Sequence, residues 1–414
     1  MLFLKINLFL TGLFSLFALP SYGNFILSHI FLILSFYLII ILLLYYHVKK
    51  NVIKFQNIDI FIISLAFLYY ATTLIGTLNS GQYKGIITSQ IFLLVFFLIF
   101  IIYKFNFRLI NTLLLGFIWS SFITSLYVIF DSFYFYSGNF KSLNERIWPE
   151  IFLGKAGEHT LTNISSYGGI IIFRPAGFSW DPGLSITGTV IAFVLIAENI
   201  VKIKYKKVFL GLLLIGILLS FSKTSIIALF FYFLLKIFKI DKLVIKFLES
   251  NKISFLNIII LLVFLSLFYI GFFIPYDSDV IDLSNARHLK YLTSVFYYPY
   301  VDYLLELIFG YGYTGVGVFF NKYVTWLKNE NFYFGENLNP ESTLTNLFFY
   351  GGFIGSLFWI ITFLYSFYKG NRAIKIVLLT IILLAFGYSI NSIWFNFIYL
   401  SLVVQGLRNG KNLH

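Results

Sequence analysis

The run IITSQIFLLVFFLIFIIY, residues 86–103, decides the fold class, because it contains eighteen residues and no charged side chain. Apolar runs of nearly twenty residues are what a transmembrane helix requires. Similar runs recur along the whole chain, which is 59% hydrophobic and only 11% charged. We therefore predict an all-α protein, a polytopic transmembrane helical bundle, since a helix satisfies its own backbone polar groups in lipid.

Counting the apolar runs predicts about twelve helices in a single integral membrane domain, residues 1–414. Two stretches, residues 208–240 and 376–406, are too long for one helix and short for two, so counts of ten and eleven stay open. The first run is similar to a signal peptide, but its poor cleavage site and the run directly after it favour a first helix. The expected spans are residues 4–20, 24–46, 60–78, 86–103, 109–130, 184–200, 208–221, 225–240, 253–273, 344–367, 376–389 and 393–406.

Basic residues set the expected orientation, because cationic loops stay on the cytoplasmic side of a membrane. Twenty of the 30 Lys and Arg residues share one side of the membrane if both chain termini are cytoplasmic. The two long loops, residues 131–183 and 274–343, then face outward. We expect these extracytoplasmic loops to carry short amphipathic helices that lie along the membrane surface.

The composition excludes several classes of function. The 30 basic residues outnumber 17 acidic ones, but they cluster in short loops and so indicate topology rather than nucleic-acid binding. The chain has no cysteine, which excludes a thiol nucleophile and a Cys-ligated metal, and its five His residues show no ligand spacing. We expect no metal and no cofactor, since the sequence carries no motif for ATP or a redox group.

A polar and rigid segment interrupts the apolar pattern at FRPAGFSWDPG, residues 173–183. Arg174 offers a planar fork of donors suited to phosphate or carboxylate, and Asp181 offers an acceptor seven residues later. Proline and glycine residues in the segment hold the two charges on a shaped loop. The alternative is a turn in which Asp181 and Pro182 begin the next helix, and the two roles are compatible.

Three further charged residues are expected on the outer side, each beside a helix end. Lys223 lies in a short polar break, where it either reaches lipid headgroups or contacts a lipid-linked phosphate. Arg287 opens a helical pattern in the second long loop. Glu341 directly precedes an apolar helix, where an acidic residue also stabilises the helix dipole.

Together these groups indicate glycosyl transfer from a lipid diphosphate. Guanidinium groups neutralise the departing diphosphate, and a carboxylate deprotonates the attacking hydroxyl. The sugar-phosphate bond of such a donor carries its own activation, so the enzyme mainly positions the acceptor. We expect Glu341 and Asp181 as the catalytic carboxylates, with Glu341 favoured as the base because of its longer reach. Arg174, Arg287 and Lys223 are expected at the diphosphate.

The chain resembles the polytopic O-antigen polymerase and ligase superfamily of bacterial envelopes. Four motifs carry the resemblance in order: Arg174-x-x-Gly177-x-x-x-Asp181-Pro182, Ser222-Lys223, Arg287 with a Gly-rich segment at residues 309–317, and Pro340-Glu341-Ser342. The resemblance implies an undecaprenyl-diphosphate-linked oligosaccharide as donor and chemistry on the outer face of the bacterial cytoplasmic membrane. It also implies membrane lipid, a chain-length regulator and a flippase as partners.

Two departures from the family pattern bear on the role. Lys223 stands where the family often has Arg, which removes bidentate binding at that position. Glu341 stands where ligases of the group typically carry His, which favours a polymerase. An O-antigen ligase and a polysaccharide or lipid transporter are the alternatives, although nearly uncharged helices and unequal loops argue against a transporter.

Overall fold

The computed structural model describes residues 1–17, 21–22, 25–48, 55–81, 84–147, 164–167, 170–178, 182–237, 304–313, 343–387 and 393–411. It is mostly helical, and eleven helices of twelve residues or more lie within these ranges. Each of them corresponds to one predicted span, and the remaining span, residues 253–273, lies outside the described residues. The eleven are α1 (Leu2–Leu13), α2 (Leu27–Val48), α3 (Asn57–Asn79), α4 (Lys84–Asn106), α5 (Arg108–Tyr134), α9 (Pro182–Ala197), α10 (Lys206–Leu219), α11 (Lys223–Ile237), α18 (Thr343–Lys369), α19 (Arg372–Gly387) and α20 (Ile393–Lys411).

The two stretches whose helix count was open each form two helices, namely α10 with α11 and α19 with α20. At the first break the Ser220 hydroxyl donates to the Ile217 carbonyl at 2.7 Å, which satisfies a carbonyl at the end of α10. Phe221 follows with a left-handed φ of 49°, which turns the chain away from the helix axis. The short polar break is therefore a tight turn between two short helices.

Two short pairs of antiparallel strands depart from the all-α expectation. β1 (Ser21–Tyr22) pairs with β2 (Phe25–Ile26), and β3 (Ile164–Tyr167) pairs with β4 (Ile170–Phe173). β3 and β4 are rich in Ile and aromatic residues, which favour strands. A search for long apolar runs does not detect them because each contains at most four residues.

The beginning of the predicted first outer loop is helical. α5 continues to Tyr134, beyond the expected end of that span at residue 130, and a π-helical turn, Phe135–Asn139, follows it. A short helix, α6 (Leu143–Ile147), comes next, and the second predicted loop contains α15 (Leu304–Phe309). The polar start of the first loop is thus built onto the end of a long helix.

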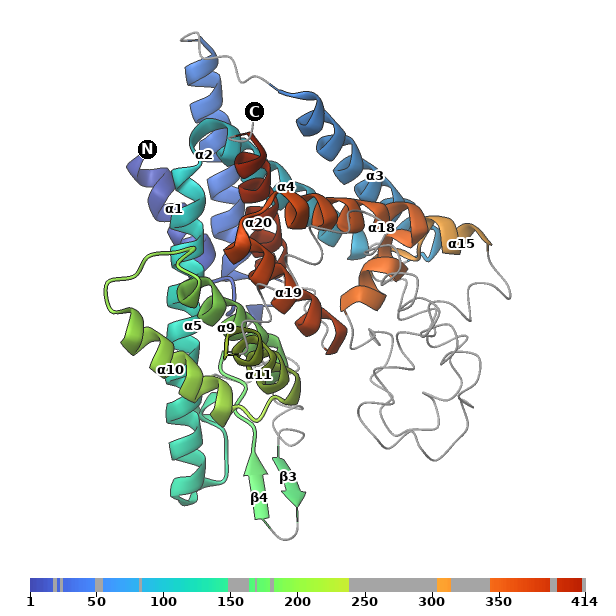
Figure 1. Cartoon of the computed structure of the whole chain (residues 1–414). Coiled ribbons are helices and arrows are strands. Elements are labelled where there is room, and N and C mark those ends of the chain that lie inside the picture. Colours follow the sequence, from blue (N-terminus) through green and yellow to red (C-terminus); the bar gives the residue numbers. More distant parts are fainter. Residues whose placement is uncertain are drawn as a thin grey trace.

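The helices form a bundle in which α5 runs along one side and packs against α1, α9 and α10 (Figure 1). On the other side α3 packs against α18, and α15 contacts both of them. The start of α1 and the end of α20 lie toward the same end of the bundle, at the top of Figure 1. The hairpin of β3 and β4 projects from the opposite end, which we call the hairpin end.

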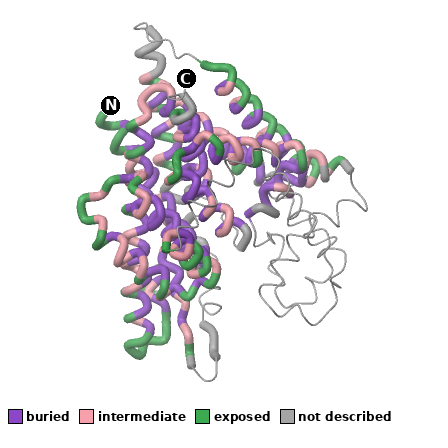
Figure 2. Tube along the Cα trace, viewed as in Figure 1, coloured by how far each residue is buried: buried purple, intermediate pink, exposed green. Residues whose placement is uncertain are grey.

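Within the described ranges, four helices are long and apolar enough to cross a membrane: Asn57–Asn79, Gly85–Asn106, Arg108–Asn139 and Asn346–Lys369. Buried residues lie where the helices face one another, while the free side of α3 is exposed (Figure 2). Large apolar side chains such as Ile60, Phe61 and Phe67 occupy that exposed side. Lipid tails are the natural neighbour for such a surface, because they accept apolar groups that water does not.

A break in α18 receives the Gly-rich turn of the second predicted loop. Gly352 has φ 62° and ψ −164°, a conformation that a residue with a Cβ rarely adopts. Residues 310–313 pack into this region, where the Tyr311 N–H donates to the Phe349 carbonyl at 2.6 Å. The hydroxyls of Tyr313 and Tyr69 lie 3.2 Å apart inside the bundle. The turn therefore joins α3 to the two parts of α18.

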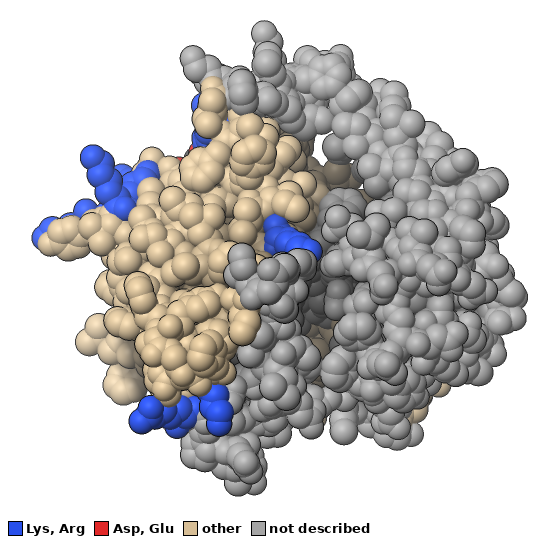
Figure 3. Space-filling model, turned by 90° about the horizontal axis from the view of Figure 1, so that it is seen from below, with Lys and Arg blue, Asp and Glu red and all other residues tan. Residues whose placement is uncertain are grey.

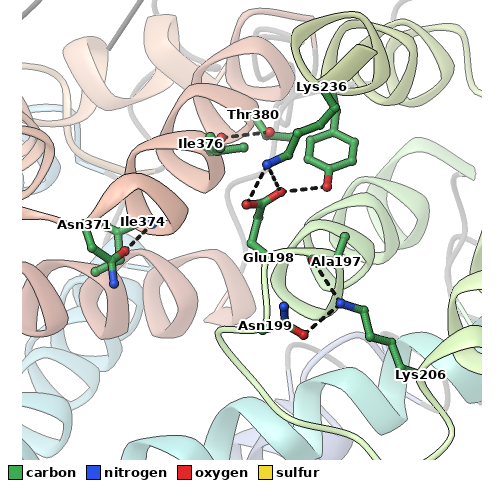
Figure 4. A network of polar contacts seen from close by, with 10 residues as sticks. Ala197, Glu198, Asn199, Lys206, Lys236, Asn371, Ile374, Ile376 and Thr380 are labelled. Carbon is green, nitrogen blue, oxygen red and sulfur yellow. Dashed lines mark hydrogen bonds and ion pairs between the residues drawn. The ribbon is translucent and has the colours of Figure 1, made fainter. Parts of the chain in front are cut away.

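Two ion pairs fix helix ends among the described residues. Lys104 at the end of α4 pairs with Asp59 at the start of α3, and Asp59 is fully buried. Lys236 lies 2.7 Å from Glu198, which also accepts a 2.8 Å hydrogen bond from the Tyr232 hydroxyl (Figure 4). These pairs connect α3 to α4 and the end of α9 to α11. In the eleven long helices, every charged residue lies within about one turn of a helix end.

Replacing Lys104 with Met should destabilise the fold by on the order of 3 kcal/mol, because the buried Asp59 carboxylate would lose its cationic partner. Thermal unfolding in detergent measures this loss. Lys207→Met is the matched control, since Lys207 is exposed on α10, and it should leave the unfolding temperature nearly unchanged. Adding Asp59→Asn to Lys104→Met should restore much of the stability. Equal unfolding temperatures for the two Lys variants would show that the buried pair contributes nothing.

Candidate functional site

The residue directly before Arg174 packs firmly against the residues that follow α5. Phe173, the last residue of β4, is buried and stacks on Phe135 with ring centroids 4.2 Å apart. Its backbone N–H donates to the Tyr136 hydroxyl at 3.0 Å. The pairing of β3 with β4 holds the same residue opposite Ile164. The backbone directly before Arg174 is therefore fixed by packing, by a side-chain hydrogen bond and by a strand partner.

The residues directly after Arg174 are buried against α5 and α9. The Ala176 carbonyl accepts a hydrogen bond from the Ser185 hydroxyl at 2.8 Å. Gly177 has a φ of 65°, and a Cβ at this position would lie 2.8 Å from the Thr124 methyl group, so the loop needs glycine here. Phe178 packs between the rings of Phe17 and Tyr127. The sequence predicted a shaped loop, and the structure places it on the surface of α5.

A polar network ties this loop to the end of α5. Asp131 is fully buried and accepts the Leu143 N–H at 2.6 Å and the Ser142 hydroxyl at 3.1 Å. Ser142 in turn accepts the Asn144 N–H at 3.2 Å. The Asn144 side chain donates to the Gly177 carbonyl at 2.8 Å. Hydrogen bonds thus connect α5, the start of α6 and the Arg174 loop.

The backbone on both sides of Arg174 is held by hydrogen bonds. One nitrogen of its guanidinium group nevertheless has no hydrogen-bond partner among the described residues. The side chain is partly exposed, whereas its Nε atom is buried and forms no hydrogen bond with any residue that the structure describes. A buried donor without a partner costs roughly 1–3 kcal/mol, so such a group calls for an explanation. An anion that displaced the atoms now covering Nε would supply the missing acceptor.

A second arginine of the predicted first outer loop, Arg146 on α6, differs from Arg174. Arg146 is exposed, and its guanidinium donates to the Tyr134 hydroxyl at 3.0 Å. This hydrogen bond raises the pKa of Arg146. Its ring contact with Tyr134 is also a cation–π geometry, with the guanidinium carbon 5.9 Å from the ring centroid. Arg146 is therefore a natural control for Arg174.

Lys223 is exposed at the first position of α11. The neighbouring Ser222 hydroxyl donates to the Ser225 hydroxyl at 3.0 Å, which orders the turn from which Lys223 projects. The turn lies toward the hairpin end of the bundle (Figure 1). An exposed ammonium group at a helix start is compatible with either expected role, contact with a lipid headgroup or with a lipid-linked phosphate.

Three of the predicted site residues, Asp181, Arg287 and Glu341, lie outside the described residues. The structure thus fixes the surroundings of Arg174 and the place of Lys223, while the assembly of the whole constellation stays a prediction. Viewed from below, at the hairpin end, the described surface shows Lys and Arg in separate groups and very few acidic atoms (Figure 3).

Sequence reasoning did not assign a role to two carboxylates that the structure singles out. Asp131 is a buried acceptor for the loop, and Glu306 on α15 has a buried Oε2 atom with no hydrogen-bond partner among the described residues. Asp131 could not be found from a local pattern, because the groups that it bonds belong to Ser142 and Leu143, which come eleven and twelve residues later. Nothing in the sequence distinguishes Glu306, because acidic residues are common in the first turn of a helix, where they interact favourably with the helix dipole.

A second cluster of polar residues lies at the C-terminal end of α9, away from Arg174. Lys206 donates to the Ala197 carbonyl at 2.9 Å and to the Asn199 side chain at 2.8 Å, beside the pair of Glu198 and Lys236 (Figure 4). α9 has 16 residues and so separates this cluster from the Arg174 loop by roughly 24 Å. The cluster therefore connects helices and is not part of the candidate site.

No protein-family model, no curated protein and no solved structure matches this chain. Among the residues that the structure describes, no group of three or more His, Asp and Glu side chains is placed to hold a metal ion.

Proposed function

We propose that this chain is a membrane glycosyltransferase that polymerises undecaprenyl-diphosphate-linked oligosaccharide repeat units into O-antigen, capsular polysaccharide or exopolysaccharide. The observation that supports this most is the state of Arg174. Arg174 lies on a loop at the end of a long apolar helix, the backbone of this loop is held on both sides of Arg174, and the buried Nε of Arg174 has no partner among the described residues. A lipid diphosphate presents its anionic oxygens next to such a helix end, while its tail stays in the membrane.

The proposed reaction needs one bond to form and one to break. A hydroxyl oxygen of the acceptor sugar attacks the anomeric carbon of the donor, and the bond from that carbon to the diphosphate oxygen breaks. The electron pair leaves with undecaprenyl diphosphate, whose growing charge Arg174, Arg287 and Lys223 neutralise. The hydroxyl proton passes to a carboxylate, for which Glu341 is our first candidate and Asp181 the second.

The proposed location is the bacterial cytoplasmic membrane, with both termini in the cytoplasm and the chemistry on the outer face. The distribution of Lys and Arg supports this orientation, and so does the position of the start of α1 and the end of α20 at the end opposite to the β3–β4 hairpin (Figure 1). Membrane lipid, a flippase that supplies the donor and a chain-length regulator are the proposed partners.

One observation favours a transporter as a second candidate, because broken helices such as α18 often line substrate paths in transporters. Two others oppose it. The Gly-rich turn packs against the break, and the charged residues of the long helices lie near helix ends rather than at mid-membrane. An O-antigen ligase is the remaining alternative, and Glu341 in place of a His weighs against it.

Cells that lack the protein should keep single repeat units on their carrier or final anchor but lose long chains, because only chain growth is removed. The length distribution of the glycan measures this directly. Loss of glycan of every length from the lipid A core, with long undecaprenyl-linked chains accumulating, would identify a ligase instead. Accumulation of single units only on the cytoplasmic side would identify a flippase.

Arg174→Lys and Arg287→Lys should each lower polymer formation roughly 30- to 1000-fold, since losing one desolvated, charge-assisted contact costs on the order of 2 to 4 kcal/mol. Lysine keeps the charge but binds as a point and loses the fork. Polymer formed per folded protein molecule is the measurement. Arg146→Lys is the matched control and should retain activity, because that guanidinium is exposed and already bonds Tyr134. Near-normal polymer from Arg174→Lys would remove the diphosphate role.

Glu341→Gln should abolish chain growth while the protein still folds and binds donor, because the amide keeps the size of the side chain but cannot take up the proton. Asp181→Asn should instead lower protein abundance together with activity, since it weakens a helix cap. Polymer per folded molecule separates the two. Activity in Glu341→Gln, with none in Asp181→Asn at equal abundance, would reverse the assignment.

A further inference from the structure

The side chain of Asn144 lies between α5 and the Arg174 loop and contacts both. Its Nδ2 group donates to the Gly177 carbonyl at 2.8 Å, and its Oδ1 atom accepts the Tyr127 hydroxyl at 2.7 Å. Asn144 is only 3% exposed, so water cannot easily replace either bond. The amide group of Asn144 therefore connects Tyr127 on α5 to the backbone of Gly177, three residues after Arg174.

The orientation of this amide is determined by its neighbours. A tyrosine hydroxyl that donates to Asn144 must face the amide oxygen, which turns the amide NH2 group toward the Gly177 carbonyl. The Asn144 backbone is held at the same time, because its N–H donates to Ser142, which itself donates to Asp131. The donor that reaches Gly177 is thus fixed in place and in direction.

Arg174 lies between two fixed points of the backbone. Phe173 is held by Tyr136 and Phe135 on one side, and Gly177 is held by Asn144 on the other. Pro175 restricts the backbone between them further, since its ring sets φ near −65°. Residues 173–177 are therefore held at both ends. The direction in which the Arg174 side chain leaves the loop depends on the contacts of Phe173 and on the hydrogen bond between Asn144 and Gly177.

We propose that Asn144 is a positioning residue that holds the Arg174 loop in the geometry for binding the diphosphate of the donor. This inference rests on the proposed function, and it names a residue that acts through Arg174 without touching the substrate. Without the Asn144 donor, the Gly177 carbonyl loses its tie and Arg174 samples directions that no longer meet the diphosphate oxygens. When the loop already holds Arg174 in the binding geometry, the ligand does not have to order it, and the affinity for the ligand is higher.

The first test compares Asn144→Asp with Asn139→Asp. Aspartate at 144 keeps the acceptor for Tyr127 and the size of the side chain, but loses the donor to Gly177. Asn139 is exposed, and its side-chain amide donates to the Tyr134 carbonyl and the Ser137 hydroxyl and to no other described residue, so it is the matched control. We expect the affinity for undecaprenyl diphosphate in detergent to fall about tenfold or more in Asn144→Asp and to stay unchanged in Asn139→Asp. Equal affinities for the two variants would overturn the inference.

A double-mutant cycle separates positioning from a general loss of structure. In an Arg174→Ala background, Asn144→Asp should lower the remaining affinity by less than about twofold, because there is no guanidinium left to position. A purely structural role predicts the same loss in both backgrounds, and that result would overturn the inference. If Asn144→Asp fails to fold, Tyr127→Phe takes its place, since it removes the hydroxyl that orients the amide and leaves the amide itself.

A third measurement follows the loop without any ligand. The chain has no cysteine, so spin labels at Phe133→Cys, an exposed position on α5, and at Arg174→Cys, the partly exposed position that Asn144 is inferred to direct, report one distance distribution. We expect this distribution to broaden with Asn144→Asp and to stay narrow with Asn139→Asp. An unchanged distribution alongside lost affinity would overturn the positioning role. Wild-type protein that does not bind undecaprenyl diphosphate, with a loop that still depends on Asn144, would instead contradict the proposed function.

Discussion

Inside a bilayer no water reaches the backbone N–H and C=O groups, and this constraint shapes the whole chain. Helices satisfy these groups internally, which is why one apolar run after another becomes a helix. Hydroxyl side chains in the helices follow the same rule, as when Ser121 donates to the Phe117 carbonyl and Thr380 to the Ile376 carbonyl. In the long helices that the structure describes, charged side chains lie near the helix ends, where they pair or reach water.

The same constraint decides where a polar site can stand. A site for an anionic headgroup needs fixed cations next to the membrane, and helix ends are the positions that allow them. The end of α5 supplies such a position, because Asp131 is buried there and collects hydrogen bonds from the chain that follows. The loop with Arg174 is held on this end by Asn144 and by the ring of Phe135.

Rigidity and an unmet hydrogen bond occur together in this loop. The backbone around Arg174 is satisfied by Tyr136, Ser185 and Asn144, whereas the buried Nε of Arg174 has no partner among the described residues. A loop that satisfies its backbone but leaves one buried cationic donor without a partner is consistent with the anionic ligand that we propose. Binding then costs little ordering of the protein, which is the physical advantage of a fixed loop over a flexible one.

The sequence by itself determined the helical class and the approximate places of the helices that the structure describes, because these depend on local hydrophobicity. It left open whether residues 208–240 and 376–406 each form one helix or two, which the structure decided. It also pointed to Arg174 as a cation on a shaped loop, since Pro175 and Gly177 restrict the backbone locally. Only the tertiary structure decided what holds that loop. Asp131 accepts hydrogen bonds from Ser142 and Leu143, and Asn144 donates to Gly177, 33 residues later in the sequence. These hydrogen bonds depend on how the chain folds back onto α5. No local pattern encodes that packing. For the same reason, only the folded chain shows that an oxygen of Glu306 is buried without a hydrogen-bond partner among the described residues.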